Sequence, residues 1–279
     1  MDDTDYALGR TNTEYERLIE QAELMRPLTE RTLRAAGIAA GMRVLDIGCG
    51  MGDVSFLVAD IVGPQGSVVG VDLDVSVLHL ADQRRAARGL ENILFLEGDA
   101  RSVDSEGLFD AAVGRFVLMY MKDPTAALRL IAQPLRPGGI IAFHEWVAGI
   151  SPASAMNLPS LASFQDLIST TFERSGARLN IGAELYRRMQ EAGLEGEPRP
   201  LAEVACCIGQ PEVAYRRWAS FAQSMLPKIV QYGVAVEQDV MDLLDRLRRE
   251  IFDAPGLLPL SWFMVGQWAR KPPQPGSAV

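Results

Sequence analysis

The most constraining feature of this sequence is a short apolar run that ends in an acidic residue and continues into three alternating glycines. Residues 44–52 read Val-Leu-Asp-Ile-Gly-Cys-Gly-Met-Gly, and a segment with helical character follows from residue 53. Glycine lets the backbone turn sharply and approach a ligand closely, because no Cβ intervenes. The helix behind such a turn presents free backbone N–H groups. This pattern predicts a ligand-binding unit made of a strand, a loop and a helix.

Apolar segments and helical segments alternate around this motif. Strands are expected at 42–47, 67–72, 93–97, 110–115 and 140–145, and helices at 53–62, 75–88 and 124–133. Such alternation predicts right-handed βαβ units and a parallel sheet that is covered on both faces. The expected fold class is therefore α/β: a doubly wound, Rossmann-like sheet of about seven strands, with the last strand antiparallel and with helical cap insertions.

The segments outside this core are expected to be mainly helical. An amphipathic helix over 12–26 ends at Pro27, and a second short helix over 28–36 ends at Gly37. These two helices form either a lid or ordinary packing on the core. Further helices are expected at 161–175, 182–192, 211–226 and 236–252, and strands at 201–207 and 257–269.

This pattern suggests four parts in the chain. Residues 1–40 are the N-terminal lid helices, and residues 41–148 form the core that binds the cofactor. Residues 149–271 supply the remaining strands, together with helical insertions that cap the substrate. The proline-rich tail 272–279 is expected to be disordered.

Composition narrows the class of partner. Of the 279 residues, 48% are hydrophobic and 23% are charged, which is ordinary for a globular protein. The net charge of −9 argues against nucleic acid or an anionic membrane as a partner. The three cysteines make no disulfide framework, and no Cys or His pair has the spacing of metal ligands. We expect a cytoplasmic monomer or homodimer that acts on a small molecule and holds no metal.

Two more acidic positions extend the ligand-binding pattern. Asp72 ends the second expected strand, where a carboxylate can accept both hydroxyl groups of a ribose. Asp99 follows the third strand, where it can accept a hydrogen bond from the amino group of adenine. A dinucleotide-binding loop would carry a further glycine at position 53, but that residue is Asp53. This disfavours a nicotinamide or flavin enzyme.

With these motifs in register, and with a Pro-Gly-Gly turn over 137–139, the segment 42–146 resembles the class I S-adenosylmethionine-dependent methyltransferases of the small-molecule, ubiquinone/menaquinone type. The resemblance implies S-adenosylmethionine as the cofactor. It implies that Gly48, Cys49 and Gly50 line the methionine part, that Asp46 orients their loop, and that Arg115 and Phe116 lie beside the methionine. It implies that Asp72 binds the ribose, that Leu73 packs on the adenine ring, and that Asp99 and Ala100 hold the adenine edge.

Candidates for catalysis are few. His144 and Glu145 end the fifth expected strand and point to opposite faces of the sheet, and Tyr120 lies in the loop after the fourth strand. Each is either a group that binds or deprotonates the substrate or a hydrogen-bonded structural residue. Bulky apolar side chains are the candidates for substrate binding, with ordinary core packing as the alternative: Trp146, Phe164, Trp218, Phe221 and Met225.

The function expected from the resemblance is methyl transfer to a small lipophilic or aromatic metabolite. Carbon or nitrogen is favoured over oxygen as the acceptor atom, because no histidine follows residue 144 to serve as a base. Tailoring of a natural product, for example an indole, fits this expectation. Two alternatives share the same cofactor loop: an enzyme that catalyses cyclisation or rearrangement without methylation, and a binding protein that senses S-adenosylmethionine.

Overall fold

The chain folds into two compact units that are interleaved along the sequence. The computed structural model describes residues 12–100, 103, 108–148, 157–206, 210–254 and 260–273. Unit 1 comprises Met1–Met25, Trp146–Asn180 and Glu203–Met264, and unit 2 comprises Arg26–Glu145, Ile181–Ala202 and Val265–Val279. One helix and three strands each contribute residues to both units, so these boundaries do not coincide with divisions at residues 40, 148 and 271.

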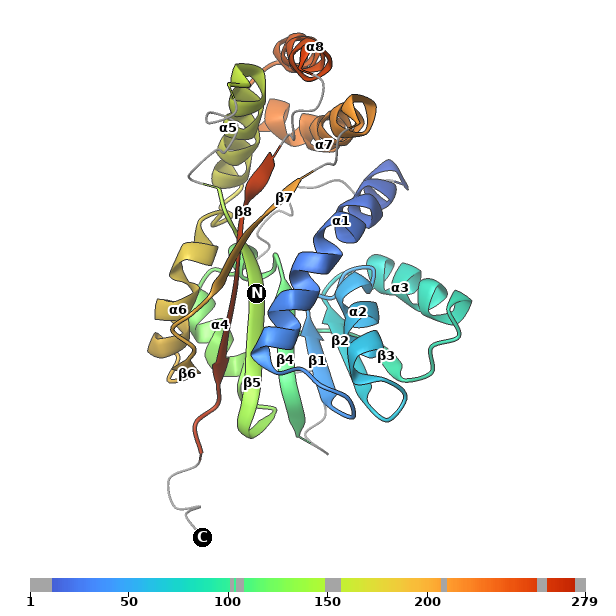
Figure 1. Cartoon of the computed structure of the whole chain (residues 1–279), viewed down its shortest axis with the longest axis vertical. Helices are drawn as coiled ribbons and strands as arrows, with labels where there is room; N and C mark the ends of the chain where they lie inside the picture. The colour runs from blue at the N-terminus through green and yellow to red at the C-terminus, as the bar shows by residue number, and fades with distance from the viewer. Residues whose placement is uncertain are drawn as a thin grey trace. The chain divides into compact units, whose positions relative to one another are not determined.

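A parallel sheet forms the centre of unit 2. Its strands are β1 (Arg43–Ile47), β2 (Ser67–Asp72), β3 (Ile93–Glu97), β4 (Phe109–Arg115) and β5 (Leu135–Val147). Neighbouring strands lie in the order β3-β2-β1-β4-β5, and every pair among them is parallel. The strand order reverses between β1 and β4, and a ligand binds beyond the strand ends at such a point. Figure 1 shows these strands side by side.

The order continues from β5 through β8 (Leu260–Arg270) to β6 (Glu195–Gly196), and β7 (Leu201–Cys206) pairs with β8 off this path. The described residues thus give an eight-stranded sheet. Strand β6 is antiparallel to β8, through Glu195 with Arg270 and Gly196 with Ala269. The expected doubly wound α/β sheet with an antiparallel strand is confirmed, with one strand more than anticipated.

Helices α2 (Asp53–Val62) and α3 (Val75–Ala87) cover the part of the sheet formed by β1, β2 and β3 (Figure 1). Local sequence fixes where the helices of unit 2 begin. Asp74 caps α3 by accepting the N–H of Ser76, and Asp123 caps α4 (Pro124–Ile131) by accepting the N–H of Ala126. Helix α6 (Ile181–Glu191) also belongs to this unit.

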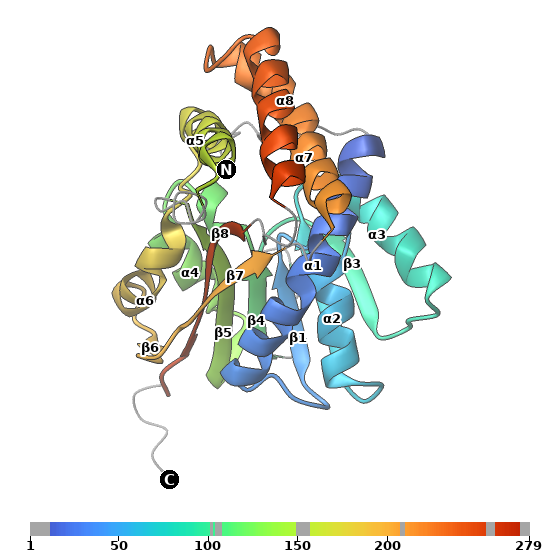
Figure 2. The same cartoon turned by 45° about the horizontal axis from the view of Figure 1, so that its top comes forward.

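Unit 1 is built mainly of helices. Helices α5 (Pro159–Arg174), α7 (Pro211–Gln231) and α8 (Glu237–Asp253) pack on one another, and Figure 2 shows α7 and α8 running alongside each other. Each buries an apolar stripe, which on α8 consists of Val240, Leu243, Leu244, Leu247 and Ile251.

The predicted helix break at Pro27 is wrong. Helix α1 runs without interruption from Asn12 to Ala36, with Pro27 inside it. A proline inside a helix removes one hydrogen bond and costs about 3 kcal/mol. Apolar side chains are buried both before and after it, among them Met25 and Leu33. Burial of this face outweighs the local cost, and the same holds for α7, which continues through Pro227 to Gln231 instead of ending near residue 226.

The expected Pro-Gly-Gly turn over 137–139 is also wrong, because these residues lie within the first part of strand β5. The register shows why a turn pattern is tolerated there. Leu135 pairs with Phe109, and Ile140 pairs with Ala111, so the chain bulges between these two pairs. Gly138 adopts a φ of 76° inside the bulge, a conformation that suits glycine.

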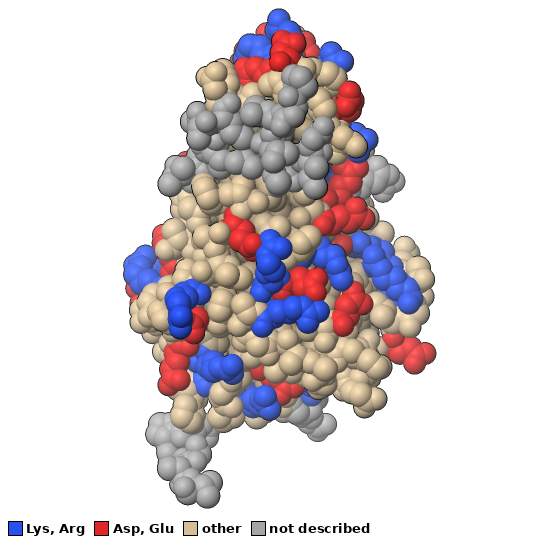
Figure 3. All heavy atoms as spheres, viewed as in Figure 1, with Lys and Arg blue, Asp and Glu red and all other residues tan. Residues whose placement is uncertain are grey.

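Some expectations fall on residues outside the described ranges. They are the last residue of the strand predicted over 201–207, the first residues of the strand predicted over 257–269, and most of the tail 272–279. On the face in Figure 3, basic and acidic side chains are interspersed among the described residues. Of the helices within those ranges, none is both long enough and apolar enough to cross a bilayer.

Candidate functional site

The glycine loop after β1 owes its shape to three left-handed residues. Gly48, Gly50 and Gly52 have φ angles of 62°, 52° and 84°, a region in which other residues are strained. A Cβ on Gly48 would lie 2.5 Å from Cγ2 of Val117, and one on Gly52 would press on Phe95 and Phe56. A Cβ on Gly50 would meet nothing within 4 Å. Two of the glycines are therefore required by packing, and Gly50 faces open space.

Asp72 ties the end of β2 to this loop. Its Oδ2 accepts the backbone N–H of Gly50 at 2.8 Å, and its Oδ1 accepts that of Asp74 at 3.0 Å. Burial raises the pKa of Asp72, and these N–H donors oppose the rise. Each carboxylate oxygen can accept a second hydrogen bond. Asp72 can therefore shape the loop and still accept hydroxyl groups from a ligand.

Asp46 is a buried acid with one oxygen unsatisfied. Its Oδ2 accepts the hydroxyl of Ser55 at 2.6 Å, and its Oδ1 has no hydrogen-bond partner among the described residues. Burial raises the pKa of Asp46 to about 7, and the hydrogen bond from Ser55 and the charge of Arg115 oppose the rise. The hydrogen bond that Asp46 accepts comes from Ser55 of α2 and not from the glycine loop.

Arg84, which the sequence pattern did not single out, contacts the end of the glycine loop that leads into α2. From α3 it donates to the backbone carbonyl of Met51 at 2.6 Å and forms an ion pair with Asp53 at 2.6 Å. Asp53 is the first residue of α2, where a negative charge also favours the helix N-terminus. Asp53 occupies the position where a dinucleotide-binding loop needs glycine. Its side chain instead holds α3 through the ion pair with Arg84.

Arg115, at the end of β4, lies in a buried polar cluster that also includes Thr29 and His144. Its Nη1 donates to Oγ1 of Thr29 at 3.2 Å, and the same oxygen lies 3.1 Å from Nδ1 of His144. Burial lowers the pKa of His144 to about 3, and the charges of Arg115 and Arg31 add to this effect. His144 is therefore neutral at physiological pH, and its ring stacks on Phe116 with centroids 6.2 Å apart.

Glu145 points to the opposite side of β5 and is fully buried. Its Oε1 accepts the backbone N–H groups of Val117 and Leu118, while its Oε2 has no hydrogen-bond partner in the described structure. Burial raises the pKa of Glu145 to about 8, and the N–H donors oppose the rise. These contacts match the alternative of a structural polar group. Tyr120 ends the short 3-10 helix η1 (Leu118–Tyr120) that follows and is partly exposed.

The residues expected around adenine lie at the ends of β2 and β3. Leu73 follows Asp72 with 53% of its surface exposed, so its apolar side chain is accessible at the end of β2. Asp99 is partly exposed and Ala100 is buried. Cys49 is a buried free thiol, and burial raises its pKa far above the ordinary value. We therefore expect Cys49 to contribute through its backbone.

The five candidates for substrate binding are all buried in unit 1: Trp146, Phe164, Trp218, Phe221 and Met225. With Phe172 and Trp262, the aromatic residues among them form a continuous cluster. Centroids of Trp146 and Trp262 are 5.0 Å apart, and those of Phe164 and Trp218 are 5.6 Å apart. The indole Nε1 atoms of Trp218 and Trp262 are buried and have no hydrogen-bond partner among the described residues. Tryptophan N–H groups usually find one when they are buried.

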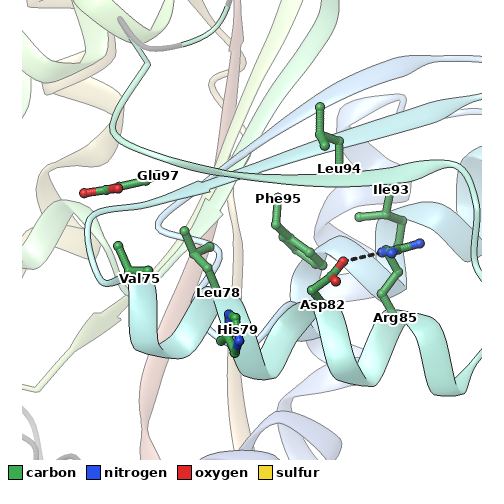
Figure 4. Close-up of a pocket in the computed structure, with 9 residues that line it drawn as sticks. All are labelled: Val75, Leu78, His79, Asp82, Arg85, Ile93, Leu94, Phe95 and Glu97. Carbon is green, nitrogen blue, oxygen red and sulfur yellow. Dashed lines mark hydrogen bonds and ion pairs between the residues drawn. The ribbon is translucent and has the colours of Figure 1, made fainter.

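A separate hollow lies between α3 and the edge strand β3, as Figure 4 shows. Leu78, Phe95 and the ion pair of Asp82 with Arg85 help to line it. No residue of the expected cofactor set lines this hollow. Within the described ranges, no three His, Cys, Asp or Glu side chains are grouped so that they could hold a metal ion.

Comparison with known proteins agrees with this geometry. A family model described as a methyltransferase domain matches residues 38–193. The chain is 34% identical to aklanonic acid methyltransferase DauC of Streptomyces over 52% of this chain and 67% of that enzyme. It is 30% identical to demethylmenaquinone methyltransferase of Geobacillus stearothermophilus over 71% of this chain and 84% of that enzyme. The structure of geranyl diphosphate methyltransferase with bound S-adenosylmethionine superposes with a TM-score of 0.52 at 16% identity and shares the fold, covering 94% of this chain and 92% of that one.

The strand order, the glycine loop and the acids at the strand ends define a class I methyltransferase fold. The chain belongs to the family of methyltransferase domains, and S-adenosylmethionine is the cofactor of this class. With other relatives the alignment is shorter and spans about half of their length, as with the 46% of the demethylmenaquinone methyltransferase of Lactococcus lactis.

Proposed function

We propose that this protein transfers the methyl group of S-adenosylmethionine to a carbon or nitrogen atom of a small lipophilic, aromatic metabolite. The observation that carries the proposal is the set of groups around the glycine loop. Gly50 faces open space, Asp72 holds the loop with lone pairs to spare, and Asp46 keeps a buried oxygen without a partner. An unpaired buried polar atom is rare in a native protein, and a bound ligand would explain it.

These residues fit the parts of the cofactor. Gly50 would admit the methionine backbone, because a side chain there would fill the open space. Asp72 would accept the ribose hydroxyls, and the exposed side chain of Leu73 would pack on the adenine ring. When bound, the sulfonium supplies a methyl group that is already electrophilic. The protein then has to hold the acceptor in line and exclude water, and positioning of this kind is worth roughly 7–11 kcal/mol.

The buried candidates for a general base support an acceptor that needs little deprotonation. His144 has a pKa lowered to about 3, so it is a weak base at neutral pH. Glu145 has a pKa raised to about 8 and is engaged by backbone N–H groups. An effective base needs a pKa close to the working pH, which His144 lacks, and it must also reach the substrate, whereas Glu145 is fully buried. Carbon and nitrogen acceptors therefore fit this site better than an unactivated hydroxyl.

The aromatic cluster of unit 1 supports the class of acceptor. Two indole N–H groups, those of Trp218 and Trp262, lie unpaired among aromatic rings. An aromatic compound that carries a carbonyl or quinone oxygen would complement both the rings and the N–H donors. The relatives named for aklanonic acid and demethylmenaquinone act on small molecules and are consistent with such a choice.

The test is a methyl-transfer assay with the purified full chain and S-adenosylmethionine. The acceptors are a hydroxylated naphthoquinone, an aromatic polyketide and an indole. We expect S-adenosylhomocysteine to form only with an acceptor present, together with a product that is one methyl group heavier by mass spectrometry. Tight binding of S-adenosylhomocysteine without turnover of any acceptor would favour a sensor. An acceptor that is rearranged without gaining mass would favour a cyclase.

A further inference from the structure

A hydroxyl group on α1 joins two strand-end side chains of the site. Thr29 is 1% exposed, accepts a hydrogen bond from Arg115 and lies within hydrogen-bond distance of His144. Arg115 and His144 are direct partners in the register of β4 with β5. We infer that Thr29 is a positioning residue, which fixes the guanidinium of Arg115 at the carboxyl end of β4 to receive the carboxylate of the cofactor. This inference rests on the proposed function, because it takes the strand ends as the cofactor site.

The surroundings of Arg115 show why its orientation has to be fixed. Burial lowers the pKa of Arg115, and the negative charges of Asp53 and Asp46, which attract the guanidinium, oppose this effect. A long side chain held only by such attraction could turn toward either acid. Thr29 gives it a neutral and directional partner on α1 instead. The positive charge therefore stays available for an anionic ligand.

His144 is the third member of the cluster formed with Thr29 and Arg115, and it carries no charge. Its low pKa keeps the imidazole neutral, so it can lie beside the cation without repulsion. Its Nδ1 meets the same hydroxyl oxygen that Arg115 uses, and its ring stacks on Phe116. Phe116 itself has a φ of 57°, which is unusual for a residue with a side chain and marks a constrained turn directly after Arg115. One hydroxyl thus ties α1 to both strand ends.

The chain offers a matched control on the same helix. Thr32 lies one turn further along α1 and is also 1% exposed. Its Oγ1 has no hydrogen-bond partner in the described structure. Replacing either threonine by valine removes a buried hydroxyl and keeps the shape of the side chain. The two variants therefore differ mainly in whether Arg115 and His144 lose a partner.

The test compares Thr29→Val, Thr29→Ser and Thr32→Val in two measurements: the calorimetric Kd for S-adenosylhomocysteine and the melting temperature of the ligand-free protein. We expect Thr29→Val to weaken binding by about tenfold or more, the loss typical of one hydrogen bond to a charged group. Thr29→Ser keeps the hydroxyl and should restore binding, and Thr32→Val should bind normally. A lower melting temperature with unchanged Kd for Thr29→Val would overturn the inference.

A double-mutant cycle separates positioning from general packing. If Thr29 acts through Arg115, then Thr29→Val should cost little in a protein that already carries Arg115→Ala. Equal losses with and without Arg115 would overturn the inference. If Thr29→Val does not fold, Arg115→Lys replaces it, since a lysine cannot reproduce the guanidinium contact, and unchanged binding would count against the inference. Wild-type protein that fails to bind S-adenosylhomocysteine would instead overturn the proposed function itself.

Discussion

Oε1 of Glu145 accepts the backbone N–H of Leu118 at 2.8 Å, and the same oxygen also accepts that of Val117 at 2.9 Å. One buried carboxyl group thereby holds the turn that leads out of β4. An unpaired buried N–H costs about 1–3 kcal/mol. We expect Glu145→Leu to lower the free energy of unfolding by about 2–5 kcal/mol, since both groups lose their partner. Glu145→Gln keeps an acceptor oxygen and should lose far less, as measured by urea unfolding at pH 7.

The same residue predicts how stability depends on pH. The pKa of Glu145 is raised from its ordinary value to about 8, so the folded state keeps a proton that the unfolded chain releases above its own pKa. Stability from this group therefore falls as pH rises, until the folded carboxyl also ionises. Between pH 6.5 and 8 we expect wild type to lose about 1–2 kcal/mol relative to Glu145→Gln. Parallel curves for the two proteins would show that Glu145 ionises normally.

Asp72 should matter for the cofactor more than for the fold. Asp72→Ala removes the acceptor for Gly50 and, in the proposed cofactor site, the acceptor for the ribose hydroxyls, and each hydrogen bond to a charged group is worth about 1.5–3 kcal/mol. We expect the affinity for S-adenosylhomocysteine to fall by at least about tenfold in calorimetry. Asp82→Ala removes an exposed acid of α3 and serves as the control. Unchanged affinity in Asp72→Ala would remove Asp72 from the site.

Alanine substitutions at three glycines with similar φ angles can separate the cost of backbone strain from the loss of a ligand contact. Gly50 and Gly89 have φ angles of 52° and 64°, and a Cβ on either would meet no atom within 4 Å. Alanine at either position should cost about 1–2 kcal/mol of left-handed strain. Only Gly50→Ala should also weaken cofactor binding. Gly48→Ala should destabilise the protein most, because its Cβ would collide with Val117. Equal cofactor affinity in Gly50→Ala and Gly89→Ala would contradict a ligand at Gly50.

The indole groups of unit 1 give a prediction that separates acceptor binding from cofactor binding. Trp262→Phe and Trp218→Phe keep an aromatic ring and remove an N–H that has no partner among the described residues. If those N–H groups bind the acceptor, KM for the acceptor should rise while the affinity for S-adenosylhomocysteine stays constant. Stability should fall as well, because phenylalanine leaves part of the buried space of tryptophan unfilled. Trp268→Phe, on a tryptophan outside the cluster, is the control, and an equal rise in KM there would argue against the assignment.

Local sequence patterns correctly predicted the elements whose apolar runs are buried in the structure. Strand β1 is almost wholly buried, so its apolar run identified it, and the glycine loop followed from residues adjacent in sequence. Predictions failed at Pro27, where burial of neighbouring side chains outweighs a local breaker, and at 137–139, where a bulge keeps the Pro-Gly-Gly segment within strand β5. Thr29 and Arg84 escaped notice for a different reason. They act from helices distant in sequence, and only tertiary contacts bring them to the loop and the strand ends.

The interleaving of the two units has a practical consequence for anyone who wishes to redesign acceptor choice. Exchanging one continuous block with a homologue, such as everything after residue 148, would transplant only part of unit 1 and would also replace residues of unit 2. Helix α1 and strands β5, β7 and β8 each cross the division, so every junction of such a chimera falls within or beside a regular element. Point substitutions within the aromatic cluster avoid that problem, and they are the more promising route to a changed specificity.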